Sequence, residues 1–247
     1  MNWSHIQPLL FRGLVETLYM VFWSSLIAVL AGLPLGVLLV LTERGGLLQN
    51  AAVNKFLGAV VNAARALPFI VLMVALIPFT KWVTGATIGA DAAIVPLAIG
   101  AIPFFARLVE TSVREIDNGL VEAVQAMGGS TWTVIRKVLP ESFPSLVAGI
   151  TTTVVTLIGY SAMAGVLGAG GIGDLAVRYG FYRYETDVMV ITIVMLIVLV
   201  TIVQLIGDLI VRSLQRRGRA AASAVRLRLL KTRRSAAAGT KGTNHAL

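Results

Sequence analysis

The chain has 247 residues, of which 57% are hydrophobic and only 13% are charged. Soluble domains carry about 25% charged residues, so this chain lacks the polar surface that would keep it dissolved by itself. It contains no cysteine, which excludes disulfides, thiolate metal sites and cysteine nucleophiles.

The formal net charge is +9, and the basic residues are unevenly placed. Ten of the 21 Lys and Arg residues lie between Arg212 and Lys241, after the last apolar stretch. A basic segment after a membrane span follows the positive-inside rule and is attracted to anionic lipid. Since no nucleic-acid-binding motif accompanies it, we expect membrane lipid rather than nucleic acid as its partner.

The chain begins with residues 1–8, which lack the basic n-region of a cleaved signal peptide. The apolar run behind it is also too long for a signal peptide, which favours a retained first span. We expect residues 1–13 to lie outside the membrane, either as an external segment or as a short helix in the interface.

A membrane-spanning helix needs about 20 mostly apolar residues, because lipid cannot satisfy the backbone of an open structure. The sequence predicts an all-α integral membrane protein with one transmembrane domain over residues 14–211 and about five transmembrane helices. In the first of these, Pro34 and Gly36 predict a bend. The five expected spans are residues 14–41, 56–79, 92–113, 144–167 and 188–211.

The distribution of Lys and Arg predicts the orientation. With the C-terminus inside, inner segments hold 17 basic residues, ten of them in the tail, and outer segments hold four. We therefore expect the N-terminus outside and the C-terminus in the cytoplasm. Residues 212–247 form the basic tail, and its Ala, Arg, Ser, Thr and Gly composition after about residue 220 predicts disorder.

The inner connection over residues 114–143 is longer than a simple turn requires, and Gly128 and Gly129 divide it into two helix-forming halves. Ser130 is placed to cap the second half. Trp132, Ile135 and Leu139 follow at helical spacing, with Arg136 and Lys137 beside them. Such a helix either docks in a groove of a soluble partner or lies in the lipid interface, and the pattern leaves both open.

This connection resembles the EAA loop of bacterial ATP-binding-cassette importer permeases. The resemblance is carried by Glu122-Ala123-Val124, then Gly128, then Val138-Leu139-Pro140. Val124 replaces the second alanine of the pattern, and the interval from Gly128 to the Leu-Pro pair is one residue shorter. The resemblance implies a cytoplasmic coupling helix that fits a cleft on an ATP-hydrolysing subunit.

Further stretches narrow the resemblance to methionine-importer permeases, over roughly residues 14–212. They are Arg65–Ile70, Ile77–Thr80, Ala106–Glu110, Gly159–Gly165, Gly168–Gly173 and Arg178–Gly180. The resemblance implies a homodimer in the bacterial inner membrane with two ATPase subunits. It also implies an extracytoplasmic methionine-binding lipoprotein that delivers methionine, and amino-acid transport as the function.

By this resemblance the candidate ATPase-coupling residues are Glu122, Ala123, Gly128, Ser130, Trp132 and Ile135. Glu122 and Gly128 would shape the loop, and Trp132 and Ile135 would be buried in the cleft of the partner.

A second candidate set, for the substrate path, is Tyr160, Ser161 and Met163 in the fourth span. Gly159, Ala162, Ala164 and Gly165 surround these residues and allow helices to approach closely. The set therefore has two interpretations, helix packing at a dimer seam or the lining of the path.

Charged and aromatic residues near the span ends suggest local contacts. Spacings of three and four residues predict ion pairs between Arg107 and Glu110 and between Asp208 and Arg212. The aromatic residues of the outer segment 174–187 suit either an interfacial belt or a surface that receives a delivery protein.

We expect no catalytic residue, no metal site and no cofactor. Gly168–Gly173 lacks the Gly-Lys-Ser/Thr ending of a phosphate-binding loop, and the two histidines, His5 and His245, lie near the termini. ATP hydrolysis therefore belongs to a separate subunit, and this chain is not an enzyme. The alternatives are a permease for another amino acid or small solute, or an autonomous ion-driven carrier or channel. Carriers place ionisable residues at mid-membrane, where these spans have almost none.

Overall fold

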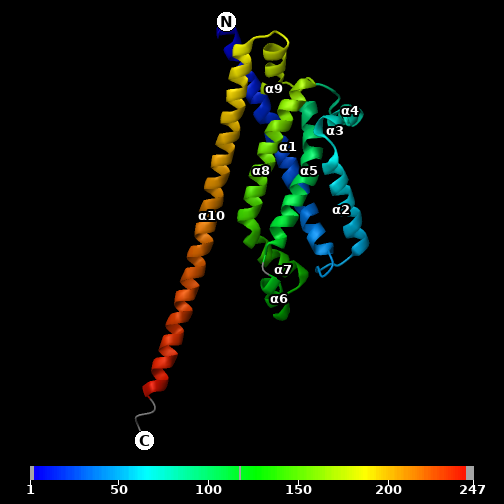
Figure 1. Cartoon of the computed structure of the whole chain (residues 1–247). Coiled ribbons are helices and arrows are strands. Elements are labelled where there is room, and N and C mark those ends of the chain that lie inside the picture. Colours follow the sequence, from blue (N-terminus) through cyan, green and yellow to red (C-terminus); the bar gives the residue numbers. More distant parts are fainter. Residues whose placement is uncertain (1–2, 117, 243–247) are drawn as a thin grey trace.

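The computed structural model describes residues 3–116 and 118–242, and it describes the backbone alone for residues 3–5, 118, 121, 125, 131, 134, 137–139 and 217–242. The described residues form helices and no strand (Figure 1). In chain order the elements are α1 (Trp3–Thr42), α2 (Ala51–Ala66), α3 (Phe69–Ala75), α4 (Ile77–Thr84), α5 (Ala90–Arg114), α6 (Asn118–Ala126), α7 (Thr131–Val138), η1 (Leu139–Ser142), α8 (Phe143–Val166), α9 (Gly171–Leu175), η2 (Ala176–Phe181, a π-helix) and α10 (Thr186–Gly242).

Four described segments are long and apolar enough to cross a membrane as continuous helices, namely Ile6–Thr42, Ala90–Arg114, Pro140–Val166 and Thr186–Arg216. A fifth span is available if α2 and α3 are counted as one broken helix. The prediction of an all-α membrane protein with about five spans is therefore confirmed.

The second span differs from the expected continuous helix over residues 56–79. It consists of α2 and α3, whose axes differ by 103°, and α4 follows as a separate short helix. Pro68 explains the first break, because a residue that precedes proline avoids helical dihedrals. Leu67 accordingly has φ −76° and ψ 129°, which is extended backbone.

The first helix is longer than expected and begins at Trp3 rather than near residue 14. Ile6 and Leu10 are buried against Leu175 and Val188, so the early turns of α1 belong to the bundle. The helix continues without interruption through Pro34.

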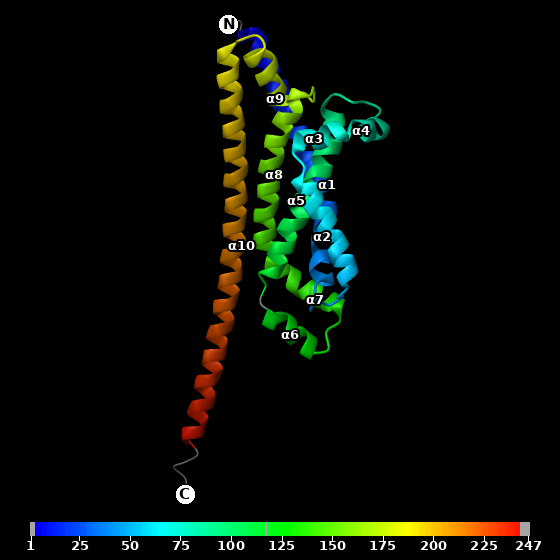
Figure 2. The same ribbon diagram turned by 45° about the vertical axis from the view of Figure 1, so that its right-hand side comes forward.

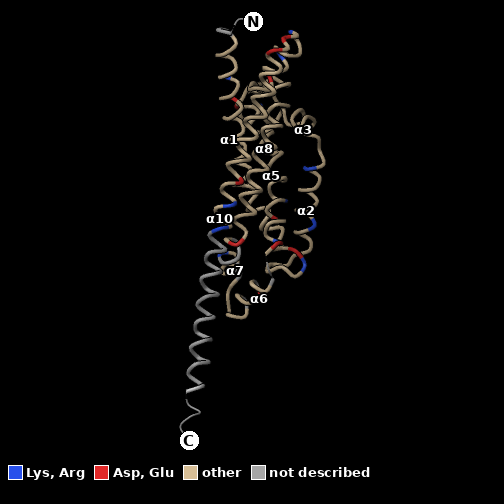
Figure 3. The backbone as a smooth tube through the Cα atoms, turned by 60° about the vertical axis from the view of Figure 1, so that its left-hand side comes forward, with Lys and Arg blue, Asp and Glu red and all other residues tan. Residues whose placement is uncertain are grey.

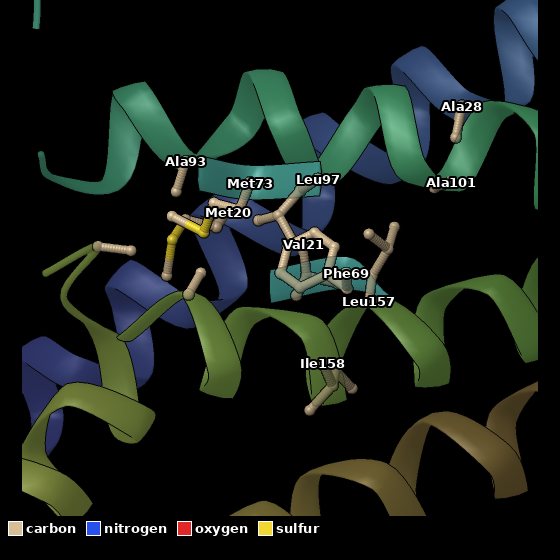
Figure 4. Packing of buried hydrophobic residues seen from close by; sticks show 12 residues of the cluster. Met20, Val21, Ala28, Phe69, Met73, Ala93, Leu97, Ala101, Leu157 and Ile158 are labelled. Atoms are coloured by element: carbon tan, nitrogen blue, oxygen red, sulfur yellow. The ribbon is translucent and has the colours of Figure 1, made fainter. Parts of the chain in front are cut away.

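The core lies where α1 crosses α5 and α8. Figure 4 shows Met20, Val21, Phe69, Met73 and Leu157 converging between these helices. Gly36 lets α1 approach α5 closely, because a Cβ atom there would overlap Ala106 O and lie 2.6 Å from Val109 Cβ. Backbone contact of this kind is a common way for helices to associate in lipid, where apolar surface gives no driving force.

The bundle has two distinct ends. The start of α1, α3, α4, α9 and the start of α10 lie at one end, which we call the α4–α9 end (Figures 1 and 2). The last turn of α1 and the helices α6 and α7 lie at the opposite, α6–α7 end. Figure 3 shows few charged residues between them, as expected where the bundle crosses hydrocarbon.

The last helix, α10, also differs from what the sequence predicts. The sequence predicts disorder after about residue 220, but the backbone of α10 is helical as far as Gly242. The reason lies in composition: residues 213–237 are rich in Ala, Leu and Arg, which have high helix propensity, and contain no proline.

Candidate functional site

Among the side chains that the structure describes in α6, that of Val124 is buried and joins the α6–α7 loop to the bundle. Val124 is 8% exposed and packs against Leu47, which follows α1, and Ile116, which follows α5. Glu122 and Ala123 lie on the same helix and are exposed. The helix α6 therefore presents Glu122 and Ala123 away from the rest of the chain.

The turn between α6 and α7 depends on Gly128. Its φ is 77°, a left-handed conformation that L side chains rarely adopt, and a Cβ atom there would meet nothing within 4 Å. The amide of Gly129 donates to Val124 O at 3.0 Å and closes the end of α6. Gly128 is thus required for its backbone conformation and not for space.

Ser130 caps α7, as the sequence predicts. The backbone N–H of Thr133 donates to Ser130 Oγ at 3.3 Å, and the Ser130 and Thr133 hydroxyl oxygens are 3.1 Å apart. Because the cap satisfies an otherwise unpaired amide, α7 begins at a defined residue, Thr131.

The side chain of Trp132 is 70% exposed on α7, whereas Ile135 is half-buried. Arg136, one residue on, is exposed. The side chain of Leu139, the third member of the predicted stripe, lies outside the described residues. A large exposed indole beside a cation on a short capped helix is a typical anchor for a partner protein.

A chain of ion pairs supports the base of this loop. Glu110 is 2% exposed and binds Arg107 at 2.6 Å and Arg114 at 2.7 Å. Arg114 also binds Glu43, in the turn after α1, at 2.9 Å. The predicted pair between Arg107 and Glu110 is confirmed, while among the described residues no ion pair joins Asp208 to Arg212.

These pairs link the last turn of α5 to the end of α1, directly before the α6–α7 loop. The ion pairs within α5 could be predicted from the sequence, because residues three and four apart share a helix face. The ion pair between Arg114 and Glu43 could not be predicted, because no local sequence pattern relates positions 43 and 114.

The candidate path residues of α8 do not share one face. Tyr160 and Met163 are about 60° apart around the helix, whereas Ser161 is about 160° from Met163. Tyr160 stacks on Phe69 of α3 with ring centroids 4.4 Å apart. Ser161 is buried and donates to Ile158 O at 2.7 Å, while Met163 is 39% exposed.

Met163 belongs to an exposed stripe along α8 that the sequence analysis missed. Its exposed members follow at intervals of four, seven, four and three residues, and the first three are small: Ala148, Thr152, Gly159, Met163 and Val166. The Thr152 hydroxyl donates to Ala148 O at 2.9 Å, so its hydrogen-bonding requirement is met within the helix. The signal was the spacing of small residues, which allows close approach of another helix.

At the α4–α9 end, α1 holds the glycine-rich turn. Glu16 accepts from the amide of Gly171 at 2.8 Å, and Thr17 accepts from the amide of Ile172 at 3.0 Å. Gly168–Gly173 thus forms a packed turn capped by side chains of α1.

The aromatic residues after this turn are exposed: Phe181 by 63%, Tyr182 by 69% and Tyr184 by 87%. Arg183 lies over the Tyr179 ring, 4.6 Å from its centroid. These positions suit both a lipid interface and contact with a protein, so the two interpretations stay open.

Among the described residues, no group of three or more His, Asp or Glu side chains is arranged to hold a metal ion. The features that remain are an exposed helix at one end, a packed turn at the other, and an uncovered stripe of small residues between them.

Residues 28–218 match the family described as binding-protein-dependent transport system inner membrane component. The chain belongs to this family of inner membrane transport components.

Two relatives illustrate the similarity. The chain is 54% identical over 210 residues to a probable D-methionine transport system permease protein MetI of Vibrio cholerae, covering 85% of this chain and 93% of the relative. It is 46% identical over 209 residues to the methionine import system permease protein MetP of Bacillus subtilis, covering 84% of this chain and 94% of the relative.

A solved structure agrees in fold. The chain superposes on a chain of the MetNI methionine ABC transporter, in an inward-facing conformation, with a TM-score of 0.83 and 47% identity. The superposition covers 85% of this chain and 97% of the other. The family match ends at residue 218, so the end of α10 and the residues after it lie beyond it.

Proposed function

We propose that this chain is the permease subunit of an ATP-driven methionine importer and that it works as a homodimer. The similarity to methionine permeases over most of both chains supports the substrate. The observation that carries the coupling mechanism is the exposed Trp132 on the capped helix α7.

The α6–α7 end is the cytoplasmic end in this proposal, and the N-terminus lies outside with the α4–α9 end. The count of 17 basic residues against four supports this orientation. The basic tail after residue 212 then faces the anionic inner leaflet, and a delivery lipoprotein would approach the exposed aromatics Phe181, Tyr182 and Tyr184.

In the proposed mechanism, α7 docks in a cleft of the ATPase and moves with it when ATP binds. The ion pairs from Glu43 to Arg107 tie the base of the loop to α1 and α5, so a displacement of α7 is passed to the spans as a rigid unit. The uncovered stripe of α8 faces the second copy, and the substrate passes between the two. All ATP chemistry belongs to the partner.

The first experiment is purification of the tagged chain from its native membrane in mild detergent, followed by an ATPase assay. We expect an ATPase subunit to co-purify, with hydrolysis that rises when methionine and its delivery protein are added. An ATPase without a methionine response would refute the substrate alone. Intact complexes that contain no ATPase would refute the importer and favour an autonomous carrier or channel.

The substrate path is tested by alanine substitutions on α8. We expect Met163→Ala and Tyr160→Ala to lower methionine uptake by reconstituted complexes roughly tenfold, since each removes an apolar group that the substrate would contact. Ser161→Ala is the control, because its hydroxyl only bonds its own helix and faces away from Met163. If Met163→Ala and Tyr160→Ala take up as much methionine as Ser161→Ala, with equal ATPase co-purification, this substrate path is contradicted.

A further inference from the structure

A cavity of about 270 Å³ lies at the α4–α9 end, between α3, α4, the start of α5 and the end of α8. Its walls include Met73, Ile77, Ile88, Ala92 and Leu167. None of the residues that line it is charged. Its volume is slightly below the roughly 300 Å³ at which ligand pockets usually begin, so it suits a small group such as one side chain.

One polar atom in the wall has no hydrogen-bond partner among the described residues. Thr80 lines the cavity and is 3% exposed, and its Oγ1 makes no hydrogen bond to any residue that the structure describes. The backbone around it is satisfied, because Thr80 N donates to Leu76 O at 2.8 Å and Thr84 Oγ1 donates to Thr80 O at 2.9 Å. Buried hydroxyls are nearly always bonded, so this one is available to an ordered water or to a ligand.

The cavity adjoins the proposed substrate path. Met73, Ala93 and Ala169 line it and also belong to the buried cluster against which Tyr160 packs. Figure 4 shows Met73 beside Ala93 within this cluster. Tyr160 and the cavity therefore border the same cluster of side chains.

The chemistry of the walls selects the occupant. An ammonium or carboxylate group would find no counter-charge among these walls, which disfavours the charged end of an amino acid there. An apolar side chain that carries a weak acceptor fits both the walls and the free hydroxyl, and a thioether sulfur is such an acceptor. A lipid acyl chain would fill the walls but offer Thr80 no acceptor.

We propose that this cavity receives the methionine side chain during transport and that Thr80 donates a hydrogen bond to its sulfur. The inference rests on the proposed function and adds to it a residue that recognises the thioether sulfur. The amino and carboxylate groups stay outside the cavity, on the side of Tyr160.

The first test compares methionine with norleucine, which has a methylene in place of sulfur. Binding of tritiated L-methionine to the purified complex is measured in competition with norleucine, without delivery protein, so that the selectivity of that protein does not enter. We expect wild type to prefer methionine by about threefold, the low end of the range for one hydrogen bond, because a thioether sulfur is a weak acceptor. Thr80→Val, which keeps shape and removes the hydroxyl, should reduce the preference to about one.

Thr84→Val is the matched control. Thr84 lies one turn further along α4, and its hydroxyl already donates to Thr80 O. We expect this variant to keep the wild-type preference. If Thr80→Val keeps that preference too, the inference is overturned, and if wild type binds no methionine and imports none with its delivery protein, the proposed function itself fails.

A second measurement locates the side chain directly. Photo-methionine, which carries a diazirine near the position of the sulfur, is irradiated with the complex, and labelled peptides are sequenced by mass spectrometry. We expect adducts on Met73, Ile77 or Ile88 that excess methionine suppresses. Adducts confined to α8 around Met163 would overturn the assignment of the cavity.

Discussion

Trp132→Ala should remove most methionine uptake while leaving the permease in the membrane at its normal level. The indole is 70% exposed, so its loss costs this chain little packing. An aromatic anchor at the centre of a protein interface contributes about 2 kcal/mol or more, which weakens ATPase binding by about thirtyfold. Co-purification of the ATPase and uptake by reconstituted complexes measure the effect.

Trp82→Ala is the control for this prediction. Trp82 is 81% exposed on α4, at the opposite end of the bundle, and has no place in the proposed ATPase contact. We expect its alanine variant to retain the ATPase. Full ATPase retention and uptake by Trp132→Ala would remove α7 from the coupling mechanism, whereas equal loss in both variants would indicate a general defect in assembly.

Gly36→Ala should destabilise the bundle by about 1–3 kcal/mol, the usual cost of overpacking a core. The new methyl group would overlap the carbonyl oxygen of Ala106 and the side chain of Val109. Since the first of these is backbone, α1 and α5 must separate to accommodate it. Thermal unfolding of the purified complex and the yield from membranes report the change.

Gly58→Ala is the comparison, because a Cβ atom there meets nothing within 4 Å. The position is inside α2, where alanine has the higher helix propensity by about 0.5–1 kcal/mol, so we expect stability to stay equal or rise. A Gly36→Ala variant as stable as wild type would show that the α1–α5 contact tolerates separation.

The most reliable predictions from sequence were those with a local physical cause. A run of about 20 apolar residues has few stable alternatives to a spanning helix, so the four continuous spans followed from hydropathy. The cap by Ser130 and the pair between Arg107 and Glu110 each involve residues three apart. Helix geometry places such residues together whatever the rest of the chain does.

Other features depended on the balance between local conformational preferences and contacts with distant parts of the chain. Pro68 was visible in the sequence, but an apolar run that continues past it fits a kinked helix as well as the 103° break observed. Whether Ser161 lies on a buried or an exposed face of α8 could likewise not be decided before the neighbours of that helix were known. Its hydroxyl bonds to the backbone of its own helix and so indicates neither face.

The sequence by itself determined the class of protein, the spans and the loop that carries Trp132, because apolar run length and helical spacing act within one segment. Only the tertiary structure decided that Glu43 meets Arg114, that Glu16 and Thr17 cap the turn at Gly171, and that Thr80 lines a cavity where no described residue bonds its hydroxyl. Each of these joins segments far apart in the chain. Their contact depends on how closely glycine and other small residues let the helices approach, which no single segment specifies.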